Sequence, residues 1–127
     1  MTNLTYLHLS DSAISDVSAL SGLVSLEYLN LSINLISDIS ALSNLPNLTD
    51  LYLSRNTISD LSPLVANTGL GSGDEVDVRN NPLSATSLNT HIPILQGRGV
   101  NVQFGASKPT IEKIEPGSRF KQGIMPR

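Results

Sequence analysis

Histidine and serine are the residues in this chain that could support nucleophilic catalysis. The two histidines, His8 and His91, lie near opposite ends of the sequence. A serine nucleophile needs a positioned base and a third group that orients the base. Serine is abundant, but no G-x-S-x-G motif is present and many serines recur periodically. We therefore interpret the serines as structural and predict no catalytic residues, so the protein is not expected to be an enzyme.

Two further segments have compositions that could bind a phosphate or a cation. Residues 69–73 read GLGSG but lack the G-K-(S/T) ending of a phosphate-binding loop. Residues 74–77 read DEVD but lack the D-x-D-x-D-G spacing of a calcium loop. We interpret them as a glycine-rich loop and as a solvated strand edge. The sequence therefore predicts no cofactor and no metal ion.

The overall composition excludes several other classes of protein. The chain has 127 residues, which is the length of one domain. Because it has no cysteine, disulfides and thiol catalysis are excluded. No apolar run approaches the roughly 18 residues that a membrane-spanning helix needs. We therefore expect no membrane insertion.

Charge is unevenly distributed along the chain, whose net charge is −3. Residues 1–104 carry nine acidic and three basic side chains, whereas residues 105–127 carry two acidic and five basic ones. The acidic main part would repel phosphate backbones, and it has no basic stripe with interleaved aromatic residues. We therefore expect no nucleic-acid partner.

Three consecutive segments of 22 residues repeat one pattern. They begin at Leu4, Leu26 and Leu48 and read LTYLHLSDSAISDVSALSGLVS, LEYLNLSINLISDISALSNLPN and LTDLYLSRNTISDLSPLVANTG. Repetition at a fixed period of 20 to 50 residues indicates a protein built from stacked units.

The recurring positions predict one short strand and one helical turn in each unit. The fourth and sixth residues of a unit are leucine, while the third and fifth are polar or tyrosine, which indicates a strand with one buried face. A Ser-Asp pair, such as Ser37-Asp38, follows later in the unit. We expect its oxygen atoms to cap a short helical turn.

Asn34 and Asn56 hold the ninth position of their units, among apolar residues. A buried amide must form hydrogen bonds or cost about 1–3 kcal/mol. We expect these side chains to bind backbone groups of their own turn and of the adjacent unit. Ser12 holds the same position in the first unit and is expected to do this more weakly.

The pattern LxxLxLxx(N/S)xI followed by SD(apolar)S(A/P)L resembles the leucine-rich repeat, and the 22-residue spacing is similar to the internalin-type subclass. This resemblance covers about residues 1–83. It implies an α/β solenoid, a right-handed superhelix with a curved parallel sheet and short helical turns on the convex side. It also implies that another protein binds the concave face of the sheet.

The repeat divides residues 1–104 into four units and a terminal cap. The units lie near residues 4–25, 26–47, 48–69 and 70–83, and a C-terminal helix–strand cap follows over residues 84–104. The strand of the fourth unit begins three residues later than the 22-residue spacing predicts, which indicates a glycine-rich insertion near residues 67–73. In the cap, we expect a helix that starts at Ser84 or Thr86, and we expect Pro93 to kink or shorten this helix.

Both ends of the chain depart from the repeat. The sequence begins part-way through a unit, which predicts a fragment of a longer repeat protein. Its first unit would then expose apolar residues and favour self-association, namely Leu4, Leu7, Leu9 and Ile14. Residues 105–127 are expected to be a linker or the truncated start of a following module. The segment KPTIEKIEPGS loosely resembles the first strand of an immunoglobulin-like module of bacterial surface proteins.

The residues that face away from the predicted core form the candidate binding surface. They are Tyr6, His8, Asp11, Tyr28, Asn30, Ile33, Asp50, Tyr52, Arg55, Glu75, Asp77 and Arg79. These positions vary between units while the framework does not, and tyrosine and arginine are enriched at binding hot spots.

Three functions fit these observations. The first is a protein-interaction module of bacterial type, for which we favour a secreted or cell-surface location over the cytoplasm. The second is a structural spacer between other domains, and the third is an intracellular regulatory subunit of an enzyme. The sequence leaves open the identity of the partner, the organism and the number of upstream repeats.

Overall fold

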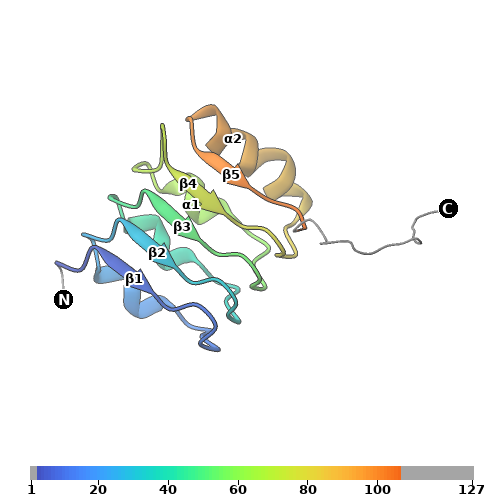
Figure 1. Ribbon diagram of the computed structural model, residues 1–127. Coiled ribbons are helices and arrows are strands. Elements are labelled where there is room, and N and C mark those ends of the chain that lie inside the picture. Colours follow the sequence, from blue (N-terminus) through green and yellow to red (C-terminus); the bar gives the residue numbers. More distant parts are fainter. Residues whose placement is uncertain (1–2, 107–127) are drawn as a thin grey trace, which may run out of the picture.

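A computed structural model describes residues 3–106 of the chain (Figure 1). The segment predicted as a linker therefore lies, from residue 107 onward, outside the described residues. The strands are β1 (Tyr6–His8), β2 (Tyr28–Asn30), β3 (Asp50–Tyr52), β4 (Glu75–Asp77) and β5 (Asn101–Gln103). The helical segments are η1 (Ser18–Gly22), η2 (Ser40–Asn44), α1 (Ser62–Ala66), η3 (Ser87–His91) and α2 (Ile92–Gly97).

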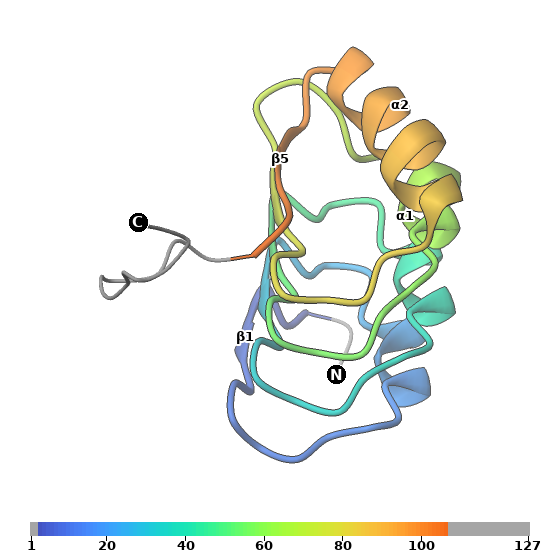
Figure 2. The same cartoon turned by 90° about the vertical axis from the view of Figure 1, so that its right-hand side faces the viewer.

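The five strands pair in chain order to form one parallel sheet. Each strand leads through a loop into a helical segment on the other side of the molecule, and the chain then returns to start the next strand. Figure 2 shows the sheet along one side of this stack and the helical segments along the other. The predicted α/β solenoid is therefore confirmed.

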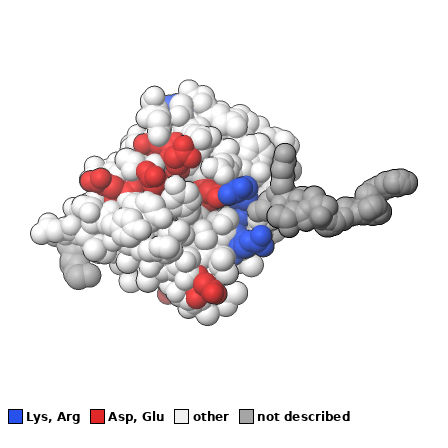
Figure 3. All heavy atoms as spheres, in the orientation of Figure 1, with Lys and Arg blue, Asp and Glu red and all other residues white. Residues whose placement is uncertain are grey.

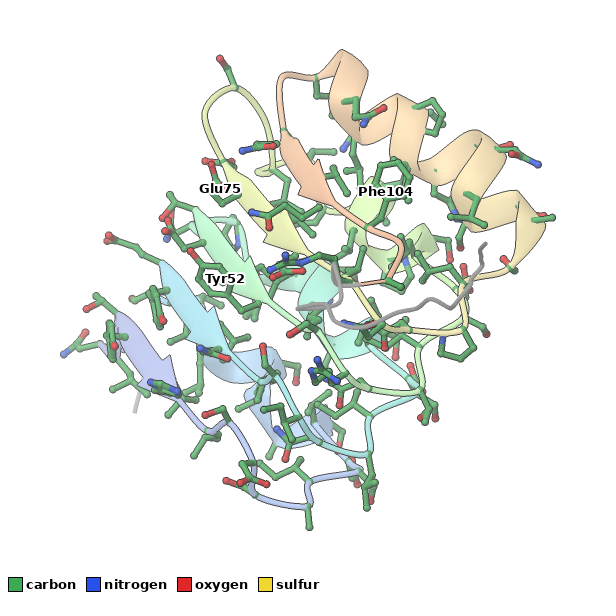
Figure 4. All side chains as sticks on the ribbon, turned by 45° about the vertical axis from the view of Figure 1, so that its right-hand side comes forward. Tyr52, Glu75 and Phe104 are labelled. Carbon is green, nitrogen blue, oxygen red and sulfur yellow. The ribbon has the colours of Figure 1, made fainter. Side chains whose placement is uncertain are left out.

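The core fills the space between the sheet and the helical segments. Leu29 and Leu51, at the centre of β2 and β3, are fully buried, whereas Leu7 in β1 is half-buried. At the other end of the described stack, Phe104 follows β5 and is 45% exposed (Figure 4). Burial therefore depends on a coil on each side, because one coil alone cannot enclose its own apolar residues.

Asparagine side chains join neighbouring coils along one edge of the core. The Oδ1 atom of Asn56 accepts a hydrogen bond from the Ile36 amide of the preceding coil at 3.0 Å. Its Nδ2 group donates to the carbonyls of Leu31 in that coil and of Leu53 in its own coil, each at 3.0 Å. Asn34 repeats the arrangement, as predicted for it and for Asn56, and Asn81 does so in the fourth coil. The hydroxyl of Ser12 reaches only the carbonyl of Ser10, so its bond stays within one coil.

Aspartate caps the helical segment of each repeat. Asp16, Asp38 and Asp60 each accept a hydrogen bond from a backbone amide two residues later, at 2.9 Å. These bonds stabilise the charged carboxylates and hold their pKa values below the ordinary value. In each predicted Ser-Asp pair, the aspartate therefore binds the first amide of the helical segment, from the position just before the N-cap residue.

The glycine-rich insertion lies between α1 and β4. Asn67 is buried there and donates to the carbonyls of Leu42 and Leu45 in the preceding coil at 2.9 and 3.0 Å. A Cβ atom on Gly69 would lie 2.2 Å from the carbonyl oxygen of Pro46. This close approach requires a glycine, so the insertion is a packed part of the fold.

The last helix consists of η3 and α2 with the two helical residues before them, and Ser84 is its N-cap. The hydroxyl of Ser84 accepts a hydrogen bond from the Ser87 amide at 3.1 Å. Pro93 does not shorten this helix as predicted, because the π-helical turn η3 continues directly into α2. Pro93 falls in the first turn of α2, directly after the π-helical turn, where the hydrogen-bond register changes.

We predict that Asn56→Ala lowers the free energy of unfolding by about 3 kcal/mol, because it leaves several buried backbone groups without partners. The matched control is Asn44→Ala, at an exposed position outside the sheet, which should change it by less than about 0.5 kcal/mol. Urea unfolding followed by circular dichroism measures both values. Equal losses in the two variants would show that the asparagine bonds do not hold the coils together.

We also predict that the cost of removing a leucine depends on its position in the stack. Leu51→Ala should lower the free energy of unfolding by about 3–4 kcal/mol, and the equivalent Leu7→Ala by only about 1 kcal/mol. The same unfolding assay compares them. A loss at Leu7 as large as that at Leu51 would contradict the burial seen across the stack.

Candidate protein interface

The in-register strands arrange the exposed side chains of the sheet in two rows. We call these two rows the sheet face. The first row contains Tyr6, Tyr28, Asp50, Glu75 and Asn101, and the second contains His8, Asn30, Tyr52, Asp77 and Gln103. Because paired strands lie about 4.8 Å apart, neighbouring members of a row are within contact distance. A substitution in one coil therefore changes the surroundings of the next.

Three tyrosines form a continuous aromatic surface across the first three strands. The rings of Tyr6 and Tyr28 are stacked, with centroids 4.3 Å apart and planes only 6° from parallel. The ring of Tyr52 lies 5.5 Å from that of Tyr28, tilted by 50°. Tyr6 is 57% exposed. We call these residues the tyrosine ladder, because each strand adds one ring to a surface that faces away from the core.

Carboxylates gather at the beginnings of the strands beside this ladder, as the space-filling view shows (Figure 3). Asp50 and Glu75 are the first residues of β3 and β4 and are partners in the sheet register. The pKa of Tyr52 is raised, first by partial burial and then by the negative charge of Asp50, by Tyr28 and by Glu75. The tyrosine hydroxyl thus lies in the negative field of both carboxylates.

Asp77 and Arg79 form an ion pair within the sheet face. The guanidinium of Arg79 donates two hydrogen bonds to the Asp77 carboxylate, from Nε at 3.0 Å and from Nη2 at 2.8 Å. Asp77 is only 5% exposed. This pairing raises the pKa of Arg79 through the hydrogen bond and the charge of Asp77. Although both residues were predicted as binding residues, Asp77 is covered by its own partner.

The residues that lie three positions after the end of each of the first four strands share a left-handed backbone conformation. They are Asp11, Ile33, Arg55 and Asn80, with φ between 55° and 61°. This conformation is costly for a β-branched residue such as Ile33. The Ile33 amide donates to the Ser54 carbonyl, and the Arg55 amide donates in the same way to the Arg79 carbonyl. Arg79 therefore corresponds to Ser54, one position before the equivalent of Arg55. Three of the predicted residues, Asp11, Ile33 and Arg55, thus hold equivalent positions, and Asn80 holds this position in the fourth coil.

Sequence reasoning missed the residues that β5 adds to the sheet face. Asn101 and Gln103 extend the two rows, and the Nδ2 group of Asn101 donates to the Glu75 carboxylate at 2.9 Å. The alternation of residues 100–104 was sufficient to identify both, because Val100 and Val102 take the buried positions. The strand was predicted, but only as part of a cap.

A serine, a histidine and an aspartate do meet in space, behind the sheet. Nδ1 of His91 lies 3.1 Å from Oγ of Ser87 and 3.9 Å from Oδ1 of Asp60. Both partners thus approach the same ring nitrogen, whereas a catalytic triad uses the two different nitrogens. The buried Ser87 hydroxyl also donates to the Ser59 carbonyl and accepts from the Leu61 amide. Its geometry is therefore that of a bridge between the last helix and the third coil.

Other parts of the described chain offer less to a ligand. An apolar hollow of about 160 Å³ at the first coil is lined mainly by core residues such as Leu9, Val17 and Leu31. Within residues 3–106, no three acidic or histidine side chains come together to hold a metal ion. Over the same range, no helix has the length and apolar character needed to cross a membrane. The sheet face remains the best candidate site.

Comparison with known proteins places this architecture in a family. The family model described as leucine-rich repeats in two copies matches residues 2–44 and again residues 24–66. No curated protein matches the chain. Two solved structures from Listeria monocytogenes are similar at 33% identity over 81% of this chain, an internalin C2 with a TM-score of 0.68 and a second internalin (inlF) with a TM-score of 0.67.

The chain spans well under half of the length of these relatives, 42% of the first and 28% of the second. The match rests on the repeats and on the stacked parallel strands described above. The chain belongs to the leucine-rich repeat family, and its repeats are of the internalin type.

Proposed function

We propose that this chain is a non-catalytic module that binds another protein through its sheet face. The tyrosine ladder is the observation that carries this proposal. Aromatic rings in contact across three strands leave apolar area in water, and a partner that covers these rings gains free energy by removing this area from water. Tyrosine also binds at low cost in side-chain entropy, which explains its enrichment in binding surfaces.

The size of the face sets a limit on the affinity of this chain alone. Five strands with four gaps give a width of about 19 Å, and each three-residue strand together with the residue after it gives a height of about 13 Å. The projected area of roughly 250 Å² is well below the roughly 800 Å² per partner that is typical of a stable complex. We propose that the chain binds weakly by itself and forms part of the binding surface of a longer repeat protein.

We propose a secreted or cell-surface location for the protein. The likeness to two Listeria internalins supports a bacterial setting. The resemblance of the segment KPTIEKIEPGS to a module of bacterial surface proteins supports the surface location. Detection of the protein in the culture medium or on intact cells tests this part of the proposal.

Replacing both Tyr28 and Tyr52 by alanine should reduce retention of the partner at least about tenfold in a pull-down from cell extract or host-cell lysate, because the ladder loses two of its three rings. The control is Leu88→Ala, an exposed apolar side chain on the last helix, which should leave retention unchanged. Thermal unfolding of each variant confirms that the fold is intact. If the parent chain retains no partner, a structural spacer is the better interpretation.

A further inference from the structure

We infer that the partner presents a cationic side chain, arginine or lysine, to the sheet face where Tyr52 meets Asp50 and Glu75. This inference rests on the proposed function and names the chemistry of the partner. Three steps carry it: the apposition of two like charges, the aromatic ring beside them, and the lack of a compensating cation in the described chain.

Asp50 and Glu75 are register partners on neighbouring strands, and their side chains project from the same face of the sheet. Like charges directly opposite each other in a sheet are destabilising. Within residues 3–106, Arg79 forms an ion pair with Asp77 and the His91 ring lies 3.9 Å from Asp60, so neither Asp50 nor Glu75 has a cationic partner there. The Glu75 carboxylate accepts a hydrogen bond from the neutral amide of Asn101 at 2.9 Å. The fold therefore tolerates a repulsion that an external cation would remove.

Tyr52 adds the second element of a cation site. It lies on β3 next to Glu75 on β4, and both side chains leave the same side of the sheet (Figure 4). Partial burial raises the pKa of its phenol most, and the negative charges of Asp50 and Glu75 are among the causes that raise it further. A guanidinium or ammonium group over a tyrosine ring gains a cation–π attraction, which adds to its attraction to the neighbouring carboxylates.

The arginines of the described chain do not meet this need. Arg79 binds Asp77, Arg98 donates to the Val65 carbonyl, and Arg55 follows the end of β3 opposite to Asp50. Figure 3 shows most of the acidic atoms of this face over the beginnings of the strands, whereas the basic atoms near its centre lie farther along. A metal ion is a poor alternative, because within residues 3–106 no three acidic or histidine side chains gather to hold one. A cationic side chain needs only the two carboxylates and the ring.

The test uses two peptides that differ only in charge, acetyl-GRGRG-amide and its counterpart with citrulline in place of arginine. Each is titrated into the full-length, ¹⁵N-labelled chain. We expect the arginine peptide to shift the amide signals of β2, β3 and β4, with an affinity that falls as salt is added. The citrulline peptide should bind at least about tenfold more weakly, since it keeps the shape of arginine but not its charge.

Two double variants distinguish binding at this site from a general attraction to the negative charge of the chain. Asp50→Asn with Glu75→Gln should weaken binding of the arginine peptide about tenfold. The control, Asp16→Asn with Asp38→Asn, removes the same charge from the helical side, where asparagine can still cap the turns, and should leave binding unchanged. Equal affinity of the two peptides, equal losses in the two double variants, or no binding by the parent chain would overturn the inference.

Two further measurements distinguish a partner cation from the chain's own basic segment and from aromatic contact alone. A full-length variant with Lys108, Lys113, Arg119 and Lys121 changed to glutamine should bind the arginine peptide as the parent does. A rise of several-fold would show that the chain's own basic segment occupies the site, which contradicts a partner cation. In the pull-down, loss of the partner with Tyr28→Ala and Tyr52→Ala but full retention with Asp50→Asn and Glu75→Gln would refute only the cationic chemistry.

Discussion

The central constraint on this protein is that no coil can complete itself. A 22-residue unit has too few apolar residues to enclose its own leucines, and the turn after each strand leaves backbone groups that its own main chain does not pair. The neighbouring coil supplies both missing parts. Leucines of successive units merge into one core, and an asparagine of one unit binds the Ile14 or Ile36 amide and the Leu9 or Leu31 carbonyl of the unit before it. These bonds require equal spacing between coils, so the repeat length and the fold depend on each other.

The same constraint creates the sheet face. Every second residue of a strand must point inward, so the residues between them are free of the core and can vary. Pairing of equivalent residues then converts periodic positions in the sequence into rows in space, with members about 4.8 Å apart. Tyrosines that are 22 or 24 positions apart in the chain thus become a single aromatic surface. Recognition by such a surface depends on which residues share a row, more than on any one residue.

Several local conformations and contacts are explained only by residues of neighbouring coils. Asp60 and His91 are far apart in sequence, yet they meet at Ser87, where the hydroxyl bridges the third coil and the last helix. Asp77 resembles a free strand residue in the sequence, but Arg79 covers it. Ile33 takes a left-handed backbone conformation although it is β-branched, because its amide donates to the Ser54 carbonyl of the next coil. In each case, contacts across coils outweigh the local preference of the residue.

The sequence by itself determined the solenoid, the strand positions, the asparagine bonds and the outward rows of the first three coils, because these follow from a period that can be counted. The tertiary structure decided what the period does not encode. The insertion before β4 shifts the register by three residues, so only the observed pairing shows that Arg79 lies beside Ser54 and that Asn80 follows the strand. Likewise, only the packed coils place Asp50, Glu75 and Tyr52 together and reveal that Asn101 and Gln103 continue the face. The repeat predicts the order in which side chains follow one another along the sheet. It does not predict which of them come into contact, because contact depends on distances between strands in the folded protein.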